Sequence, residues 1–197
     1  IAKAGAIGPL VKLCQSGDSR GKKHAARALC LLACWNANNA KAAIVKAGAI
    51  GPLVKLCQSG DSRGKEHAAR ALQELAYLNA DNKVAIAKAG AIGPLVEDRQ
   101  GRRDRPARRG SGDAGGKKRA AGALMSLASS NADNRVAIAK AGAIGPLVEL
   151  CRSGDADGKM QAAGALMSLA SSNADNRVAI AKAGAIGPLV DLCRSGD

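Results

Sequence analysis

Apolar positions in this chain recur with a helical period, most clearly between Ala132 and Ser172. In the last part of that segment, Ala163, Leu166 and Ala170 are spaced at i, i+3 and i+7, with other apolar residues beside them. This spacing places them on one wide stripe, as expected of a helix packed between two neighbours. The pattern predicts a helix that Asp155 caps and that ends near Ser172.

Two shorter helices are predicted before that one. The stretch NRVAIAKA has the length and pattern of a first helix, which Asn131 or Asp133 caps and Gly142 ends. A second helix is predicted over about 143–152, with Pro146 in its first turn, where a missing N–H costs little. Each unit of this kind therefore contains three helices.

The three-helix unit is repeated along the chain. The segment KAGAIGPLV occurs five times, at spacings of 43, 42, 52 and 42 residues, starting at Lys3, Lys46, Lys88, Lys140 and Lys182. A period near 42 is typical of solenoids with two or three helices per repeat. The glycines between first and second helices are predicted to have positive φ. These are Gly48, Gly90, Gly142 and Gly184.

The period predicts an all-α fold of about four three-helix repeats, in one domain over residues 1–197. The repeats cover approximately 1–36, 37–79, 80–130 and 131–172, with a partial repeat at 173–197. The stack is expected to be incomplete at both ends, and end-to-end self-association is one consequence.

The repeated pattern x-x-N-x-x-x-I-x-x-A-G-A-I-x-P-L-V-x-L, followed by a Gly-Asp break and A-A-x-A-L-x-x-L-A, resembles the armadillo repeat. The stretch from Ser19 to Val54 is most similar to armadillo domains of U-box ubiquitin ligases, and vacuolar armadillo adaptors are similar too. The resemblance implies a right-handed α-solenoid whose third helices line a concave groove for extended peptides. It also implies a scaffold within a larger adaptor or ubiquitin-ligase-type protein. These residues contain no U-box, so ligase activity is not carried over.

The groove differs from that of importins-alpha, a related family in which a Trp and an Asn four residues later grip the peptide. Alignment of the third helices puts Arg27, Arg70, Gly122 and Gly164 at the Trp positions. It puts Leu31, Glu74, Ser126 and Ser168 at the Asn positions. No pair matches, so importin-like recognition is not expected.

The third helices of the first three repeats place polar residues at groove positions, spaced so that each set shares one helical face. The sets are Lys23, His24 and Arg27, then Glu66, His67 and Arg70, then Lys118 and Arg119. One interpretation is a set of solvated polar faces. The other is a partner-binding groove for an acidic or phosphorylated protein segment.

Charge along the chain is uneven. Residues 1–97 carry 14 basic and 6 acidic side chains (+8), residues 98–119 carry 9 and 3 (+6), and residues 120–197 carry 7 of each. Positive potential over the N-terminal two-thirds would attract acidic proteins, nucleic acid or anionic lipid. Binding of nucleic acid or anionic lipid through the basic groove and a 99–109 loop is therefore an alternative function. The scarcity of aromatic residues gives base stacking no support.

The third repeat departs from the pattern after Val96, with a basic insertion near 98–112 that makes it ten residues longer. Asp98 and Arg99 replace the Leu and Cys that close the second helix elsewhere, so that helix is expected to end early. Three interpretations of the insertion remain: a functional basic loop, a disordered insertion, or sequence from a shifted frame or retained intron. The basic loop comprises Arg99, Arg102, Arg103, Arg105, Arg108 and Arg109.

Other features argue for a binding protein without chemistry of its own. Cys14, Cys57, Cys151 and Cys193 occupy one repeat position, and stacked helices place them too far apart for disulfides, so a ladder of buried thiols is expected. No zinc quartet, phosphate-binding glycine motif or nucleophile elbow is present, so we expect no enzyme, metal or cofactor. There is no apolar run of about 18 residues and no signal peptide. A cytoplasmic and/or nuclear location is the expectation.

Overall fold

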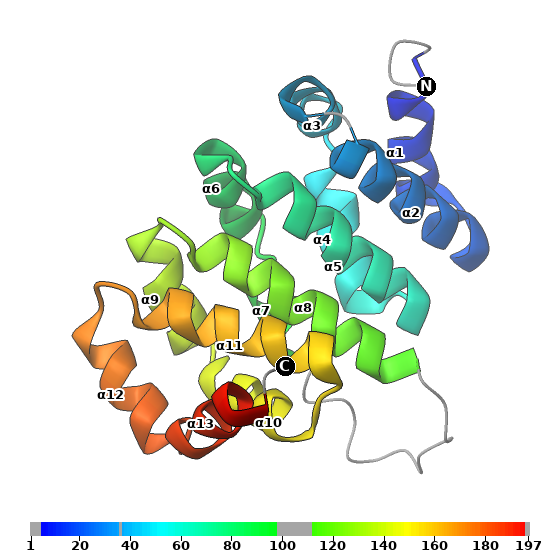
Figure 1. The fold of residues 1–197 in the computed structure, drawn as a ribbon. Coiled ribbons are helices and arrows are strands. Elements are labelled where there is room, and N and C mark those ends of the chain that lie inside the picture. The colour runs from blue at the N-terminus through cyan, green and yellow to red at the C-terminus, as the bar shows by residue number, and fades with distance from the viewer. Residues whose placement is uncertain (1–4, 36, 98–111, 196–197) are drawn as a thin grey trace.

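A computed structural model describes residues 5–35, 37–97 and 112–195, and its elements are all helices in that part of the chain. Figure 1 shows their arrangement. The helices are α1 (Ile7–Ser16), α2 (Ser19–Trp35), α3 (Ala37–Lys46), α4 (Ile50–Ser59), α5 (Ser62–Ala76), α6 (Ala80–Lys88), α7 (Ile92–Glu97), α8 (Gly112–Ala128), α9 (Ala132–Lys140), α10 (Ile144–Ser153), α11 (Ala156–Ala170), α12 (Ala174–Lys182) and α13 (Ile186–Ser195).

The helices form an α-solenoid, as the period predicts. The long third helices α2, α5, α8 and α11 pack side by side in chain order, and each also packs on the second helix of its own repeat. The helix pattern read from Ala132–Ser172 is confirmed within one or two residues by α9, α10 and α11. Successive repeats therefore stack with a constant register.

Capping residues define the helix ends. Asp155 accepts a hydrogen bond from the Gly158 N–H at the start of α11, as predicted. Of the two candidates for α9, Asn131 is the cap, because its side chain accepts from the Asn134 N–H, and Asp133 lies in the first turn. The predicted positive φ of the inter-helix glycines is confirmed, for instance at Gly142 with φ of 81°.

Polar side chains join one repeat to the next. Asn134, buried in α9, donates through Nδ2 to the carbonyl oxygens of Leu127 (3.0 Å) and of Lys83 in the preceding repeat (3.4 Å). Within the third repeat, Lys83 of α6 donates through Nζ to the Ser129 carbonyl, just after α8, at 2.7 Å. Burial lowers the pKa of Lys83 below its usual value, because the charged ammonium loses hydration. The bonds to Leu127 and Ser129 satisfy carbonyls that the end of α8 leaves unpaired, and the bond to Lys83 links α9 to α6.

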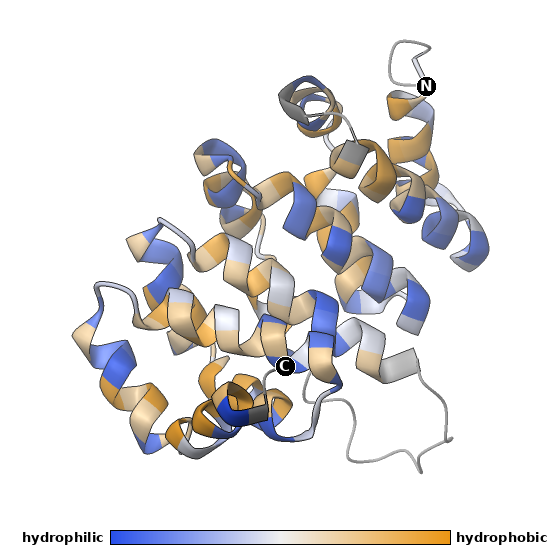
Figure 2. Cartoon of the chain, viewed as in Figure 1, coloured by the Kyte–Doolittle hydropathy of each residue, from blue (hydrophilic) through white to orange (hydrophobic). Residues whose placement is uncertain are grey.

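Small aliphatic residues make the core. The first alanine of each A-A-x-A-L segment is fully buried, at Ala25, Ala68, Ala120 and Ala162. A methyl side chain lets adjacent helix backbones approach closely, and the leucine four residues later fills the space between them. Along the helices, stretches of hydrophilic residues alternate with apolar ones (Figure 2).

The third repeat keeps its place in the stack despite its insertion. α8 packs on both α5 and α11, and Leu124 is as buried as Leu72 and Leu166 at the same position in the neighbouring repeats. α7 ends at Glu97, the last residue described before the insertion. Residues 98–111, which include the basic loop and the Asp98 and Arg99 on which the expected early helix end rests, lie outside the described part of the chain.

The expected ladder of buried thiols is correct for Cys14, Cys57 and Cys151 and wrong for Cys193, which is exposed. The Sγ atom of Cys14 lies 3.9 Å from the Lys22 carbonyl oxygen of α2, the third helix of the same repeat. No helix of the described residues covers the corresponding side of α13, so the Cys193 thiol reaches solvent. Burial raises the pKa of Cys14 to about 11, because desolvation disfavours the thiolate.

Candidate functional site: the third-helix face

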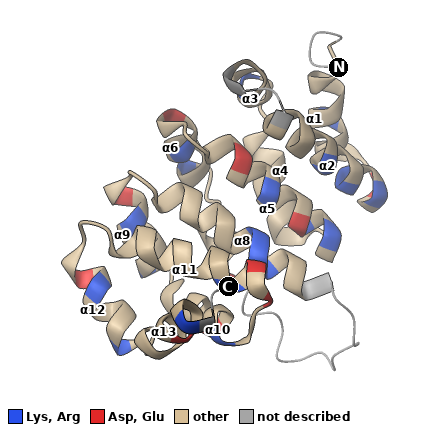
Figure 3. Ribbon diagram, in the orientation of Figure 1, with Lys and Arg blue, Asp and Glu red and all other residues tan. Residues whose placement is uncertain are grey.

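The candidate partner-binding residues all lie on third helices. Lys23, His24 and Arg27 are on α2, whereas the sets that begin with Glu66 and Lys118 are on α5 and α8. His24 and Arg27 are exposed, and the other six residues are half-buried. We call the surface formed by α2, α5, α8 and α11 the third-helix face. Lys and Arg are concentrated on its α2 and α5 half, and α11 carries no charged residue after Lys159 (Figure 3).

The charges of positive residues on α2 and α5 act on His67. Burial makes the largest contribution to lowering the pKa of His67, and the charges of Arg27, Arg70 and Lys23 lower it further. Glu66 acts in the opposite direction. His67 is therefore held neutral near pH 7 beside three cations. We call Lys23, Arg27, His67 and Arg70 the basic cluster.

The three cations of the basic cluster have no ion-pair partner among the described residues. Glu66 is directed elsewhere: a Cβ added at Gly115 of α8 would lie 2.9 Å from its Cδ, so the carboxylate sits against that backbone. Cations close together and unpaired repel one another, and an anion placed among them relieves that repulsion. The basic cluster is therefore the candidate anion-binding site of this face.

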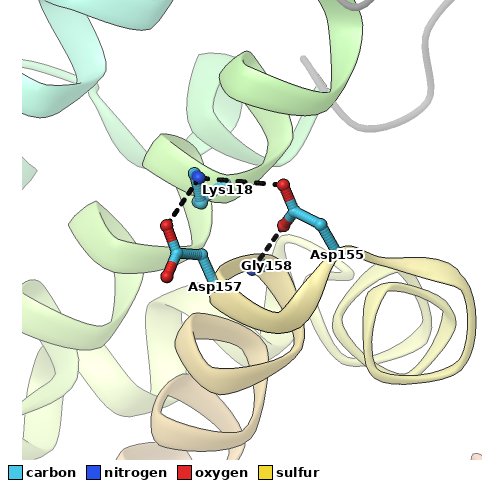
Figure 4. Close-up of polar contacts among 4 residues, drawn as sticks. All are labelled: Lys118, Asp155, Asp157 and Gly158. Carbon is cyan, nitrogen blue, oxygen red and sulfur yellow. Dashed lines mark hydrogen bonds and ion pairs between the residues drawn. The ribbon is translucent and has the colours of Figure 1, made fainter. Parts of the chain in front are cut away.

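Lys118 is different, because acidic residues of the next repeat hold it. Its Nζ donates to Asp157 Oδ2 at 2.8 Å and lies 3.7 Å from Asp155 Oδ2 (Figure 4). The hydrogen bond from Lys118 lowers the pKa of Asp157, and the charge of Lys118 adds to this effect. The two aspartates offset the positive charge of Lys118 within the structure. Its neighbour Arg119 has a buried Nε without a hydrogen-bond partner.

The surface changes character around Gly122 of α8. A Cβ at this glycine would lie 2.6 Å from Gln73 Nε2 of α5 and 2.7 Å from Gln161 Oε1 of α11, so both amides cover the glycine. Gln161 Oε1 is buried and has no hydrogen-bond partner. At Gly164 the sulfur of Met125 takes the corresponding place. Polar amides and then a thioether replace the cations of the first two repeats.

Sequence analysis places Gln161 at a groove position of the fourth repeat, but it missed Gln73. Gln73 follows the groove position of α5, Arg70, by three residues, and this spacing directs its side chain toward Gly122 of the next third helix. Ser126, aligned with an importin-type Asn position, is buried at 5% exposure and faces neighbouring helices.

Cys30 and Cys34 lie near this face, one turn apart on α2. Burial, with a smaller contribution from the nearby Cys34, raises the pKa of Cys30 to about 12. Cys34 is exposed and also has a raised pKa, again chiefly through desolvation. Neither thiol is activated as a nucleophile, because only the thiolate is reactive.

The described residues contain no group of three or more His, Cys, Asp or Glu side chains placed to hold a metal ion. They also contain no helix long and apolar enough to cross a membrane. The basic-loop arginines lie outside the described residues.

The family described as Armadillo/beta-catenin-like repeat matches residues 1–34, 38–77 and 131–171, which leaves the third repeat unmatched. No curated protein sequence matches the chain.

Several solved structures resemble the whole stack. An engineered protein is 37% identical with a TM-score of 0.84, over 98% of this chain and 73% of its own. A designed armadillo repeat protein in complex with the peptide (KR)4 is 29% identical with a TM-score of 0.81, over 96% and 75%. Computationally designed armadillo repeat proteins for modular peptide recognition are 27% identical with a TM-score of 0.79, over 94% and 74%.

Proposed function

The chain belongs to the armadillo/β-catenin-like repeat family, and we propose on that basis that it is a scaffold that binds an extended acidic segment of a partner protein. The segment lies along the third-helix face, with its carboxylates at the basic cluster. The observation that carries this proposal is the set of cations on α2 and α5 that have no ion-pair partner within the described residues.

The sign of the charge supports an acidic ligand. The similar designed protein is in complex with a peptide of alternating lysine and arginine, which is basic. In this chain, Lys23, Arg27 and Arg70 of the basic cluster carry positive charge without an ion-pair partner in the described part, so complementarity at the basic cluster calls for a negative segment. Lys118 is already neutralised by Asp155 and Asp157, and α11 is nearly uncharged, so acidic contacts concentrate on the first two repeats.

We expect Arg27→Glu/Arg70→Glu to raise the Kd for a glutamate-rich peptide at least about tenfold, or about 1.4 kcal/mol. The reversal replaces two attractive contacts with two repulsive ones. The measurement is fluorescence anisotropy with a labelled peptide at low salt. The matched control is Lys12→Glu/Lys55→Glu, which makes the same charge change on exposed residues of α1 and α4 in the same repeats.

An equal loss of affinity in both double variants would show that overall charge drives binding. Unchanged binding in Arg27→Glu/Arg70→Glu would remove the basic cluster from the function. Circular dichroism of both variants checks that helical content is retained.

His67 makes the binding depend on pH. Its pKa is lowered in the free protein by burial and by Arg27, Arg70 and Lys23. A bound carboxylate beside these groups favours the charged imidazole, so binding takes up protons and affinity rises about two- to fivefold as pH falls from 7.5 to 5.5. Glutamate, with a pKa of about 4.3, stays largely ionised in this range.

The pH dependence of stability is opposite to that of peptide affinity. An unfolded histidine, with a pKa of about 6.5, binds more protons than His67 does in the folded chain, so the free energy of unfolding falls as pH falls below that value. His67→Gln should flatten both pH profiles, and His24→Gln, the exposed equivalent on α2, should leave the His67 contribution in place. Identical profiles for wild type and His67→Gln would exclude this role.

The wider setting is part of the same proposal. We propose that the scaffold acts without enzyme activity within a larger adaptor or ubiquitin-ligase-type protein of the cytoplasm and/or nucleus. Nucleic-acid or anionic-lipid binding is the competing outcome, because the basic excess of residues 1–119 attracts any polyanion. Two results together would favour that outcome. The protein would bind heparin or anionic vesicles tightly and lose this binding when residues 99–109 are deleted, and it would have no affinity for the acidic peptide.

A further inference from the structure

The third helices begin with one shared sequence pattern, so the junctions between repeats can be compared residue by residue. The pattern is DSRGKK from Asp18, DSRGKE from Asp61, DAGGKK from Asp113 and DADGKM from Asp155. Its aspartate, its glycine and its first lysine are the same in every repeat. The junctions therefore differ in charge only at the third and sixth positions of the pattern.

The sixth position of one repeat meets the third position of the next. Between the third and fourth repeats, Lys118 Nζ lies 2.8 Å from Asp157 Oδ2 (Figure 4). Between the second and third repeats, a Cβ added at Gly115 would lie 2.9 Å from Glu66 Cδ. A cation meets a carboxylate at one junction, and a carboxylate rests against a glycine at the other. Neither pair brings like charges together.

The junction of the first and second repeats is different, because both positions are cationic. The sixth position is Lys23 and the third position of the next repeat is Arg63, and α2 packs on α5 as α8 packs on α11. The charge of Lys23 also acts on His67 of α5, in agreement with this placement. Neither Lys23 nor Arg63 has an ion-pair partner within the described ranges. We call this place the Lys23–Arg63 junction.

The nearby carboxylates are held by other groups. Asp61 Oδ1 accepts the Gly64 N–H at 2.6 Å, and its Oδ2 accepts the Ser19 hydroxyl at 3.2 Å. Glu66 lies against the backbone of the following repeat. The Lys23–Arg63 junction therefore lacks, within the described residues, the carboxylate that Asp157 supplies two junctions later. Two adjacent cations repel each other, and an anion from outside the chain relieves that repulsion.

The number and kind of cations favour a doubly charged anion here. Arg27 follows Lys23 by four residues and Arg70 follows Arg63 by seven, so four cations share one part of the third-helix face. A phosphate monoester carries a charge of about −1.5 to −2 at pH 7 and has three acceptor oxygens. The planar guanidinium of arginine binds such oxygens in pairs. A phosphate therefore offsets more of this positive charge than a single carboxylate does.

We propose that the Lys23–Arg63 junction binds the phosphate of a phosphorylated serine or threonine in the partner segment. The phosphate takes the place that Asp157 has beside Lys118, and neighbouring carboxylates of the segment contact Arg27 and Arg70. The inference rests on the proposed function, because the segment that carries the phosphate is the one bound along the third-helix face. It adds Arg63 to the site and makes affinity depend on phosphorylation of the partner.

Fluorescence anisotropy tests the proposal with three labelled peptides that share one glutamate-rich sequence. They carry serine, phosphoserine or glutamate at the same central position. For the wild type, phosphoserine should lower the Kd at least about tenfold relative to serine, because the phosphate gains charge-assisted hydrogen bonds. Glutamate at that position should lower the Kd no more than about threefold, as expected of one further exposed ion pair. The ratio of the serine and phosphoserine Kd values is called the phosphate gain.

Arg63→Asp is the decisive variant, because it copies into the first junction the lysine–aspartate pair of Lys118 and Asp157. The new carboxylate fills the place of the phosphate, so the phosphate gain should fall to about twofold or less. Lys55→Glu makes the same charge change on an exposed residue of α4 and should keep the tenfold gain. Arg63→Lys should keep most of the gain, because a cation remains. Circular dichroism checks the fold of every variant.

A wild type that binds the serine peptide but shows no phosphate gain would overturn this inference and leave the proposed function standing. An equal phosphate gain in the wild type and Arg63→Asp would overturn it too, and so would a glutamate peptide that binds as tightly as the phosphoserine peptide. A wild type that binds none of the three peptides would overturn the proposed function together with this inference.

Inorganic phosphate separates the two sources of a phosphate group. At about 1 mM and constant ionic strength, it should displace less than half of the phosphoserine peptide, because the free ion lacks the contacts of the segment. Complete displacement would show that the junction takes the free ion, and the partner segment would then be the wrong source.

Discussion

Leu124→Ala should lower the free energy of unfolding by about 3 kcal/mol, because the surrounding helices close only partly over the cavity. Leu124 is 1% exposed in α8, which packs on both α5 and α11. The expected effect is large because the substitution weakens two helix interfaces at once. Urea unfolding followed by circular dichroism measures it.

The comparison variants show whether the third repeat is a true member of the stack. Leu72→Ala, at the same position of the second repeat, should cost a similar amount, because Leu72 is equally buried. Leu78→Ala should cost about 0.5 kcal/mol or less, since Leu78 is 81% exposed. If Leu124→Ala behaves like Leu78→Ala, α8 is not packed as described.

Asn134→Ala should have the second largest effect and lower the free energy of unfolding by about 2 kcal/mol. The substitution removes the Nδ2 donor that serves the Leu127 carbonyl and the Lys83 carbonyl of the preceding repeat. The buried Leu127 carbonyl, left without a donor, carries the full desolvation penalty, whereas the lost side-chain volume is small. The bond to Lys83 crosses between repeats, so cooperativity between them should fall as well.

Asn39→Ala is the control for the asparagine prediction. Asn39 lies in α3 and is exposed, so its replacement should change the free energy of unfolding by no more than about 0.5 kcal/mol. Equal stability of Asn134→Ala and Asn39→Ala would show that the buried amide does not join the repeats. The urea midpoint and the m-value together separate a loss of stability from a loss of cooperativity.

The sequence was sufficient for the solenoid because local signals agree with the repeat period. Asp155 and Asn131 cap the helices that the apolar pattern predicts, and Gly142 has the positive φ that its position requires. These features depend on residues close in the chain. The family match over three segments supports the same fold.

Features that depend on contact between repeats were harder to predict. The pair between Lys118 and Asp157 joins residues 39 positions apart, and only the packing of α8 on α11 brings them together. Cys193 has the same local sequence as the buried cysteines, and only its uncovered side distinguishes it. The amides over Gly122 likewise come from two different helices.

We propose that the basic cluster on α2 and α5 selects an acidic segment. The most direct measurement titrates a glutamate-rich and a lysine-rich peptide of equal length against the wild type, Arg27→Glu/Arg70→Glu and Lys12→Glu/Lys55→Glu. The wild type and Lys12→Glu/Lys55→Glu should prefer the glutamate-rich peptide. Arg27→Glu/Arg70→Glu should prefer the lysine-rich peptide. A misfolded variant cannot gain a ligand, so this reversal would come from the site itself. If Arg27→Glu/Arg70→Glu still prefers the glutamate-rich peptide, the basic cluster does not select the ligand.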